Sequence, residues 1–438
     1  MKLSALLFLL PACGGGSSGQ VDAGSVDGSH AIDAPSAAVT IHVFNEGGMP
    51  VVGRAVAFLR PDDAVVAEVM TDPTGTASAP MPDGGSVTVG AAGMVPTSGA
   101  YAVVYTYLGV KNGQELTIGK PKSPAATPFK ITVTVPATVE PTAQNFQFNS
   151  TCNINASNQT NTRTVDMMLT AGCTAADFYV EAQDAQYKTL STAWRTAQPV
   201  SAGANVSAGT AFTPVVTSTL LVTNAPQFTT ITPALDLVAG SFYPVPSPFN
   251  SSITITNGSG SKKLTHGTIA GASLETRIEI AGVSDQFVIR RAAPSDFTTF
   301  DFATANLPTV ASGVAYSPTA SAVVWQESGH STDTAATDLH IKNGTARDFN
   351  WLIIGPHTSE SLHVPHLPGS LAQFNIASGD MAIPTAAIGS FPGGYERIAP
   401  HAFIEGFDFF TGFYAADRRN TWGYVLADGD TAMFASNQ

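Results

Sequence analysis

Three histidines within ten residues are the side chains best suited to chemistry in this sequence. His357, His363 and His366 lie in the segment GPHTSESLHVPHLP, residues 355–368. Imidazole is a good ligand for zinc and copper. In an extended strand His357 and His363 share one face and His366 lies opposite, unless the prolines redirect the chain. We expect an exposed, proline-punctuated loop and no resident cofactor, with a metal site on these histidines as the alternative.

His357 and Glu360 also have the spacing of the short zinc motif of metallocarboxypeptidases. That family takes its third zinc ligand from a histidine much further along the chain, whereas the last histidine here is His401. The resemblance stops at these two residues. The sequence contains no His-Glu-x-x-His, no phosphate-binding Gly-x4-Gly-Lys-Ser/Thr and no EF-hand spacing.

Cys13 is a candidate for lipid attachment. It follows Met1-Lys2 and the apolar run Leu3–Leu10, and it precedes the flexible tract GGGSSG. This order resembles the signal peptide (residues 1–12) and lipobox of bacterial lipoproteins. The resemblance implies an acylated Cys13 at the start of the processed chain. Because Gly14 replaces the Asp that retains lipoproteins at the inner membrane, it also implies the outer membrane. An ordinary cleaved signal peptide is the alternative.

Two further cysteines remain once Cys13 is assigned to the anchor. The even remainder, Cys152 and Cys173, predicts a disulfide in an exported chain. Two buried free thiols are the alternative.

The composition limits the partners of this 438-residue chain. Charged residues make up only 12% of it and the net charge is −13. An acidic surface repels phosphate backbones, which excludes nucleic acid as a partner. It favours neutral or cationic partners instead, such as envelope polysaccharide or a basic protein face.

The elements that would carry these residues are strands. After a disordered tether over residues 13–38, Val39, Ile41 and Val43 alternate with polar residues at strand period. Turn signals follow at residues 47–53, 72–75 and 83–85. Residues 39–120 resemble the carboxypeptidase-regulatory-like and bacterial Ig-like sandwich modules. The resemblance implies a non-catalytic spacer, stabiliser or binding module. The alternation and the turns predict that this segment folds alone as a small β-sandwich.

The rest of the chain also predicts β-structure. We expect a second β-domain with the disulfide over residues 121–225, in which Thr192–Thr196 forms a helical turn. A large β-rich unit, one domain or two, should occupy residues 226–438, with a hairpin turn at Asn257-Gly258. The expected fold class is therefore all-β, with two or three sandwich-like modules. The whole chain resembles, in style, the multi-domain surface lipoproteins of deltaproteobacteria such as myxobacteria.

The last forty residues are rich in aromatic and acidic side chains. Exposed aromatic rings can stack on sugars, but we expect these to form a core. The aspartates are expected in solvated turns rather than a calcium site. The aromatic residues are Phe403, Phe407, Phe409, Phe410, Phe413, Tyr414, Trp422 and Tyr424, and the aspartates are Asp408, Asp428 and Asp430.

Two function classes follow from these features. The favoured one is a membrane-anchored, non-catalytic envelope lipoprotein that acts in binding, adhesion or envelope structure. The alternative is an anchored hydrolase whose site lies in the C-terminal unit around the three histidines. The absence of a recognised nucleophile motif favours the first class.

Overall fold

A computed structural model describes residues 37–45, 47–90, 102–121, 127–138, 141–154, 158–226, 229–239, 252–281, 285–295, 297–311, 313–344, 347–403, 426–427 and 429–437. Cys13 and nearly all of the predicted tether lie outside these residues. The described part consists mainly of strands, so the predicted all-β class is confirmed. Among the described helices, none is long and apolar enough to cross a membrane.

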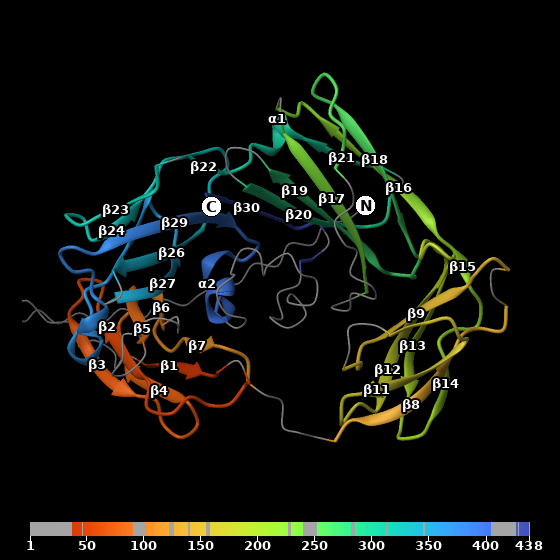
Figure 1. Cartoon of the computed structure of the whole chain (residues 1–438), viewed down its shortest axis with the longest axis horizontal. Helices are drawn as coiled ribbons and strands as arrows, with labels where there is room; N and C mark the ends of the chain where they lie inside the picture. The colour runs from red at the N-terminus through yellow and green to blue at the C-terminus, as the bar shows by residue number, and fades with distance from the viewer. Residues whose placement is uncertain are drawn as a thin grey trace, which may run out of the picture. The chain divides into compact units, whose positions relative to one another are not determined.

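One eleven-stranded sheet combines strands from distant parts of the sequence (Figure 1). Neighbouring strands are antiparallel except β6 and β27, which pair in parallel from Ala102↔Phe349 to Tyr107↔Ile354. In sheet order the strands are β17 (Thr230–Val238), β19 (Ser273–Ala281), β20 (Asp285–Ala292), β30 (Thr431–Asn437), β29 (Met381–Ser390), β26 (Thr334–Asn343), β27 (Arg347–Pro356), β6 (Ala102–Val110), β5 (Gly85–Gly90), β2 (Ala55–Leu59) and β3 (Val65–Met70).

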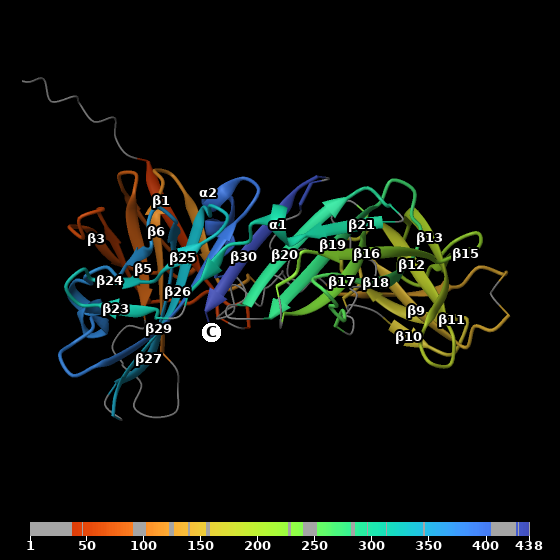
Figure 2. The ribbon, with the colours of Figure 1, turned by 90° about the horizontal axis from the view of Figure 1, so that it is seen from above.

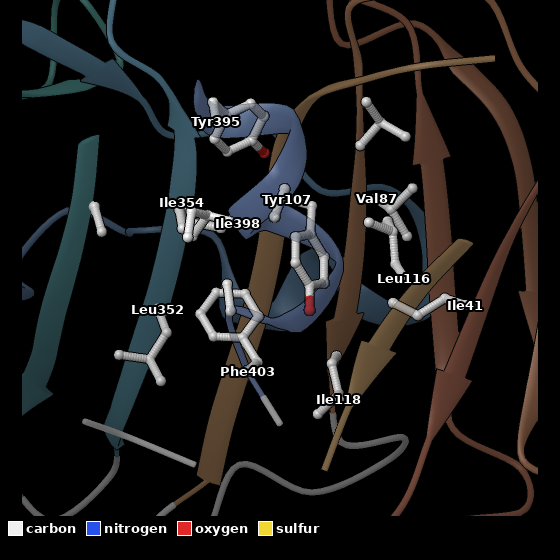
Figure 3. Close-up of a cluster of buried hydrophobic side chains, with 14 of the residues drawn as sticks. Ile41, Val87, Tyr107, Leu116, Ile118, Leu352, Ile354, Tyr395, Ile398 and Phe403 are labelled. Carbon is white, nitrogen blue, oxygen red and sulfur yellow. The ribbon is translucent and has the colours of Figure 1, made fainter. Parts of the chain in front are cut away.

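A small sheet covers one face of this large sheet. It is formed by β4 (Thr76–Pro80), β1 (Ala38–Val43) and β7 (Glu115–Ile118). The predicted alternation in β1 is confirmed, since Val39, Ile41 and Val43 are all buried. The apolar cluster between the two sheets also includes residues of α2 (Gly394–Ile398) and η2 (Ala399–His401) (Figure 3). Phe403 belongs to it, as the core interpretation predicts, with its ring 4.8 Å from that of Tyr107.

A second apolar cluster covers the opposite face of the large sheet. The five residues of β2 are therefore all buried, with Val56 and Phe58 in the first cluster and Ala55, Ala57 and Leu59 in the second. The second cluster includes residues of short elements: β22 (Thr309–Val310), β23 (Ala315–Ser317), β24 (Ala322–Val324), β28 (Ser361–His363) and the 3₁₀ helix η1 (Gly369–Phe374). Strand β25 (Glu327–Ser328) pairs with β22.

Residues 129–214 form a sandwich with a hydrophobic cluster of their own. Its larger sheet has the order β10 (Asn158–Thr160), β9 (Asn145–Ser150), β12 (Ala175–Gln183), β13 (Thr189–Pro199) and β15 (Thr213–Pro214). Its smaller sheet has the order β11 (Thr164–Leu169), β8 (Phe129–Thr134) and β14 (Asn205–Ser207). The predicted helical turn at Thr192–Thr196 is wrong, because these residues lie in β13 and pair with β12 from Glu181↔Thr192 onward.

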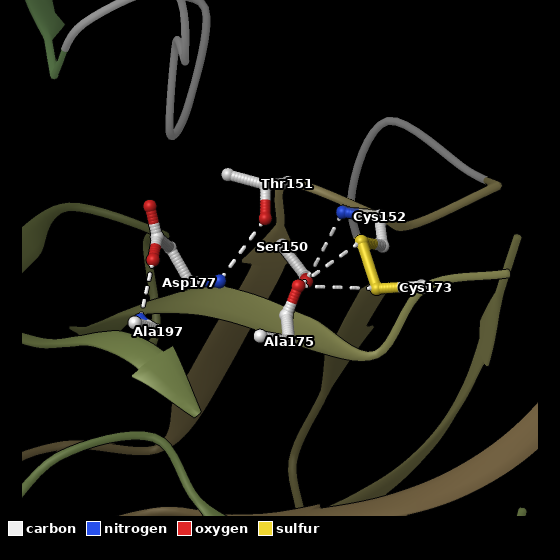
Figure 4. The surroundings of a disulfide bond; sticks show 7 residues. All are labelled: Ser150, Thr151, Cys152, Cys173, Ala175, Asp177 and Ala197. Atoms are coloured by element: carbon white, nitrogen blue, oxygen red, sulfur yellow. Dashed lines mark hydrogen bonds between the residues drawn. A yellow bond between two sulfur atoms is a disulfide. The ribbon is translucent and has the colours of Figure 1, made fainter. Parts of the chain in front are cut away.

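The disulfide joins Cys152 and Cys173 beside this sandwich, as the cysteine count predicts (Figure 4). The Cα atoms are 6.2 Å apart. The two cysteines pack against the edge of the cluster that contains Phe178. The closed loop carries β10 and β11, so the bond restrains one end of each sheet.

Replacing both cysteines by serine should lower the free energy of unfolding of this sandwich by about 3 kcal/mol, because the unfolded chain gains the freedom of the opened loop. Hydrogen exchange should accelerate in β8–β15 and stay unchanged in β2 and β27. Exchange that is unaltered in β8–β15, or that rises equally everywhere, would contradict a local restraint.

The segment from residue 216 to 310 forms another sandwich. The sheet of β18 (Gly260–His266), β16 (Val216–Thr223) and β21 (Phe297–Asp301) packs against β17, β19 and β20 (Figure 2). Helix α1 (Phe302–Ala305) follows β21, with Asp301 as its N-cap. A buried ion pair lies on β17 and β19, where Nε of Arg277 is 2.7 Å from Oδ2 of Asp236.

Two predicted turns have the expected chemistry. The carboxylate of Asp72 accepts hydrogen bonds from the backbone N–H groups of Thr74 and Thr76, and Gly75 has a φ of +76°. Asn257 and Gly258 both have positive φ values, and Thr256 bridges to Ser259, which is the geometry of a tight hairpin turn.

Strand pairing crosses the expected domain boundaries. Ser36–Gln438 forms one compact unit, and β6 of the segment 39–120 pairs with β27. In the excised segment β6 would have an open edge in place of this partner. Independent folding of 39–120 therefore stays a prediction, and the β6–β27 pairing argues against it.

Candidate binding cleft

His357 is held by its surroundings at the end of β27. Its ring stacks on that of Trp325 with centroids 6.0 Å apart. Nε2 lies 2.9 Å from Oε2 of Glu327, and Nδ1 lies 2.8 Å from Oγ1 of Thr332. Both ring nitrogens therefore have polar neighbours, and only 9% of the side chain is exposed.

His363 and His366 are tied to a different carboxylate. Nε2 of His363 is 2.9 Å from Oδ1 of Asp63, which lies in the turn between β2 and β3. The backbone N–H of His366 donates to Oδ2 of the same carboxylate at 3.0 Å. Asp63 therefore fixes the segment 363–366 against the β2–β3 hairpin.

The three histidines do not converge, because His357 lies against Glu327 whereas the segment of His363 and His366 is held by Asp63. In the part of the chain that the structure describes, no three His, Cys, Asp or Glu side chains are placed to hold a metal ion. The structure thus supplies no ligand set for the zinc or copper alternative, and metal binding by His357, His363 and His366 stays a prediction.

A cleft of about 700 Å³ opens beside His366. It lies on the face of the large sheet that carries β23, β24 and β28. Its described lining combines aromatic, proline and small polar side chains, and a volume of this order suits a ligand of a few rings. The lining residues are Tyr316, Pro318, Ser321, Trp351, Val364, Pro365, His366, Asn375, Ile376, Ala377, Ser378, Gly379, Asp380 and Ala382.

The polar side chains of the lining from residue 375 to 380 form hydrogen bonds and an ion pair within the protein. The Asn375 amide donates to the carbonyl of Leu367 and accepts from its N–H, both at 2.8 Å. The Asp380 carboxylate lies 3.2 Å from the Arg347 guanidinium and accepts from the N–H of Ala377.

Tyr316 and Ser321 also line the cleft. Burial raises the pKa of the Tyr316 phenol, and its hydrogen bond with Ser321 opposes that rise only in part. The phenol therefore stays protonated at neutral pH and can donate to a ligand. Trp351 also lines the cleft, and its indole N–H donates to Oγ1 of Thr106 on β6 at 2.8 Å.

This arrangement is suited to holding a ligand. Among the described lining residues, the one carboxylate is Asp380, whose charge is already paired with Arg347. General acid–base catalysis needs a group free to exchange a proton with the substrate. The remaining polar groups of the described lining are the Tyr316 phenol, small hydroxyls and the His366 imidazole, and of these the imidazole is the one group suited to proton transfer near neutral pH.

The sequence identified only His366 among the residues of this cleft. Tyr316, Asn375 and Asp380 lie in segments without a recognisable motif, and strand pairing brings them together. Of the C-terminal aspartates, Asp430 accepts a hydrogen bond from the N–H of Ala427 across a turn, as expected. Asp408, Asp428 and the aromatic residues named above that follow Phe403 lie outside the described residues.

The Asp63–His363 pair should make stability depend on pH. The hydrogen bond to Asp63 raises the pKa of His363 above its ordinary 6.5, although burial opposes the shift. Burial alone would raise the pKa of Asp63, but its bonds to His363 and His366 outweigh this and hold that pKa below 3.8. The His363 contribution is complete below pH 6.5 and is lost as the pH rises through the raised pKa. The Asp63 contribution is lost as the pH falls through the lowered one.

The melting-temperature difference between the parent chain and His363→Gln should therefore be larger near about pH 5.5 than near about pH 8.5. The difference should be small, because 41% of the His363 side chain is exposed. His340→Gln, which removes a half-buried histidine paired with Asp348, is the matched control. A difference for His363→Gln that grows with pH would contradict the assignment.

Comparisons with known proteins add little beyond these observations. No family model matches the chain, and no curated protein matches its sequence significantly. The TIE protein of Bacillus anthracis is 10% identical over 61% of this chain, with a TM-score of 0.16. The match covers 50% of that protein's chain.

Two pilins are also among the similar solved structures. The shaft pilin SpaA of Lactobacillus rhamnosus GG is 8% identical, and the match covers 41% of this chain and 98% of that one with a TM-score of 0.15. A streptococcal ancillary pilin is 7% identical, and the match covers 74% of this chain and 100% of that one with a TM-score of 0.13. Values this low carry no argument about function.

Proposed function

We propose that this chain is a non-catalytic protein of the bacterial envelope that binds a neutral polysaccharide in the cleft between Tyr316 and Asp380. The proposal rests on the hydrogen bonds and the ion pair that the cleft's polar side chains make within the protein. The amide of Asn375 and the carboxylate of Asp380 are bonded within the protein, so they shape the wall and are not free for chemistry.

The ligand class follows from charge and surface. The net charge of −13 disfavours anionic ligands. An aromatic ring beside small hydroxyl groups suits a sugar, which presents an apolar ring face and many hydroxyls. A diacylated or triacylated Cys13 would anchor the protein in the outer membrane, where such polysaccharides are accessible.

The binding test uses the full chain, purified in detergent, and a panel of immobilised neutral polysaccharides. Tyr316→Ala should weaken binding about tenfold, as expected for an aromatic anchor in a binding site. Tyr187→Ala removes an exposed tyrosine of the sandwich at residues 129–214, away from the cleft, and should leave binding unchanged. Equal binding by the parent chain and Tyr316→Ala would refute the cleft as the site.

A hydrolase is the second candidate, and one observation favours it. His357 has the Thr332 hydroxyl at one nitrogen and the Glu327 carboxylate at the other. This order of groups activates a nucleophile in acyl-transfer enzymes. Against it, Glu327 Oε2 also accepts the indole N–H of Trp325 at 2.7 Å, which suits a structural role. Turnover of a simple ester that is lost in both Thr332→Val and His357→Asn would support this candidate.

A further inference from the structure

A second cavity, of about 290 Å³, is lined by both sheets of the sandwich at residues 216–310. Its described lining comes from β19, from β20 and the residues that follow it, and from β21. Among these described lining residues there is no carboxylate and no aromatic ring, but there are four hydroxyl side chains and one cation. The hydroxyl-bearing residues are Thr276, Ser295, Thr298 and Thr299, and the cation is Arg290.

Arg290 is a polar exception on an apolar face of β20. Side chains two residues apart on a strand share a face, and Val288 is buried in the apolar cluster of this sandwich. Arg290 pairs in register with Thr276 of β19 and with Thr431 of β30. Because β20 has a partner strand on each side, the backbone that carries the guanidinium is fixed. Thr276 is 5% exposed, whereas Arg290 is exposed.

The charge of Arg290 has no counter-ion among the residues that the structure describes, and its side chain forms no hydrogen bond with them. Other arginines of this chain differ, because Arg277 is paired with Asp236 and Arg347 with Asp380. A guanidinium carries five N–H donors and one positive charge. At Arg290 these donors and this charge are available to a ligand in the cavity.

The chemistry of the lining selects a ligand class. A planar guanidinium binds a carboxylate through two parallel charge-assisted hydrogen bonds. Hydroxyl side chains both donate and accept, so they suit a ligand that carries hydroxyl groups of its own. The net charge of −13 disfavours anions over the surface as a whole, so the local cation admits one negative charge and not a polyanion. The volume lies near the lower end of the range for ligand pockets, roughly 300 Å³, which suits a ligand of one ring.

We propose that this cavity binds a small hydroxylated carboxylate, such as a sugar acid, through a bidentate contact between the ligand's carboxylate and the guanidinium of Arg290. The threonine hydroxyls bond to the ligand's own hydroxyl groups. The cavity shares no described lining residue with the cleft between Tyr316 and Asp380, so this site does not depend on the function proposed for that cleft.

Calorimetric titration of the full chain in detergent with sodium glucuronate, at constant ionic strength, tests this. We expect saturable binding of one glucuronate per chain, weaker binding of acetate and no binding of glucose. Arg290→Gln should weaken glucuronate binding at least about tenfold, because it removes a charge-assisted pair. The matched control is Arg60→Gln, at an exposed arginine after β2 near the other end of the large sheet, and it should leave binding unchanged.

The hydroxyl contacts have their own test. Thr276→Val keeps the side-chain shape and removes one hydroxyl, so it should weaken glucuronate binding about threefold and leave acetate binding unchanged. Tyr316→Ala should not alter glucuronate binding, which separates this site from the cleft. Unchanged melting temperatures would establish that the variants are folded.

Three results would overturn the proposal. The first is the absence of saturable glucuronate binding by the parent chain. The second is glucuronate binding by Arg290→Gln that is as strong as that by the parent chain. The third is binding of inorganic sulfate or phosphate as strong as that of glucuronate, because it would indicate an unselective anion site.

Discussion

Replacing Arg277 by methionine is expected to lower the free energy of unfolding by about 3–5 kcal/mol, because the substitution removes the guanidinium partner of a buried carboxylate. The side chains of Asp236 and Arg277 are 0% and 6% exposed, and two nitrogens of the guanidinium lie 2.7 and 3.3 Å from the carboxylate oxygens. Urea denaturation followed by tryptophan fluorescence measures the change.

The control for this prediction is the double variant Asp236→Leu/Arg277→Met. It removes both charges together, and buried pairs replaced by apolar side chains are often neutral in stability. We expect its midpoint to lie much closer to that of the parent chain than the midpoint of Arg277→Met does. If the single and double variants lose the same free energy of unfolding, the Asp236 carboxylate left without its guanidinium partner is not the cause of the loss.

Replacing Trp351 by alanine is expected to cost about 3–5 kcal/mol, as large-to-small changes of buried aromatic residues do. Trp351 is 0% exposed and belongs to the second apolar cluster. It lies where β27 meets β6, and its indole N–H bonds to Thr106. The loss should therefore reach β6 and its neighbour β5, which hydrogen exchange can detect.

Trp351→Phe separates the contribution of the hydrogen bond to stability from that of the apolar packing. It keeps most of the apolar surface and loses the hydrogen bond to Thr106, so it should cost less than Trp351→Ala. Tyr187→Ala, at a 59% exposed tyrosine, should stay within about 0.5 kcal/mol of the parent chain. Protection in β5 and β6 that is unaffected by Trp351→Ala would contradict the role of this residue in joining the two segments.

Local features of this fold are predictable because their causes are local. Asp72 and Gly75 form a turn through bonds and dihedral angles within five residues. The alternation in β1 reflects burial of one strand face, and Asn257-Gly258 supplies the positive φ values of its hairpin turn. The Cys152–Cys173 disulfide is predictable from the number of cysteines that remain after Cys13.

The features that define the cleft have non-local causes. Asp63 and His363 are separated by 300 residues, and Trp351 and Thr106 by 245. More than 200 residues, including the sandwich at 129–214, separate β6 from its neighbour β27 in the sequence. Alternation specifies which strand face is buried but not which distant strand is the neighbour. The Thr192–Thr196 error has the same origin, since pairing with β12 determines the conformation there.

The most direct test of the proposed function asks whether a bound polysaccharide is left intact. The full chain would be incubated at saturation with a neutral polysaccharide that it retains, and the bound fraction and new reducing ends would be measured over the same hours. We predict stable binding that weakens in Tyr316→Ala, with reducing ends no higher than in a protein-free blank. Reducing ends that accumulate with time, and that disappear in His357→Asn, would contradict a protein that only holds its ligand.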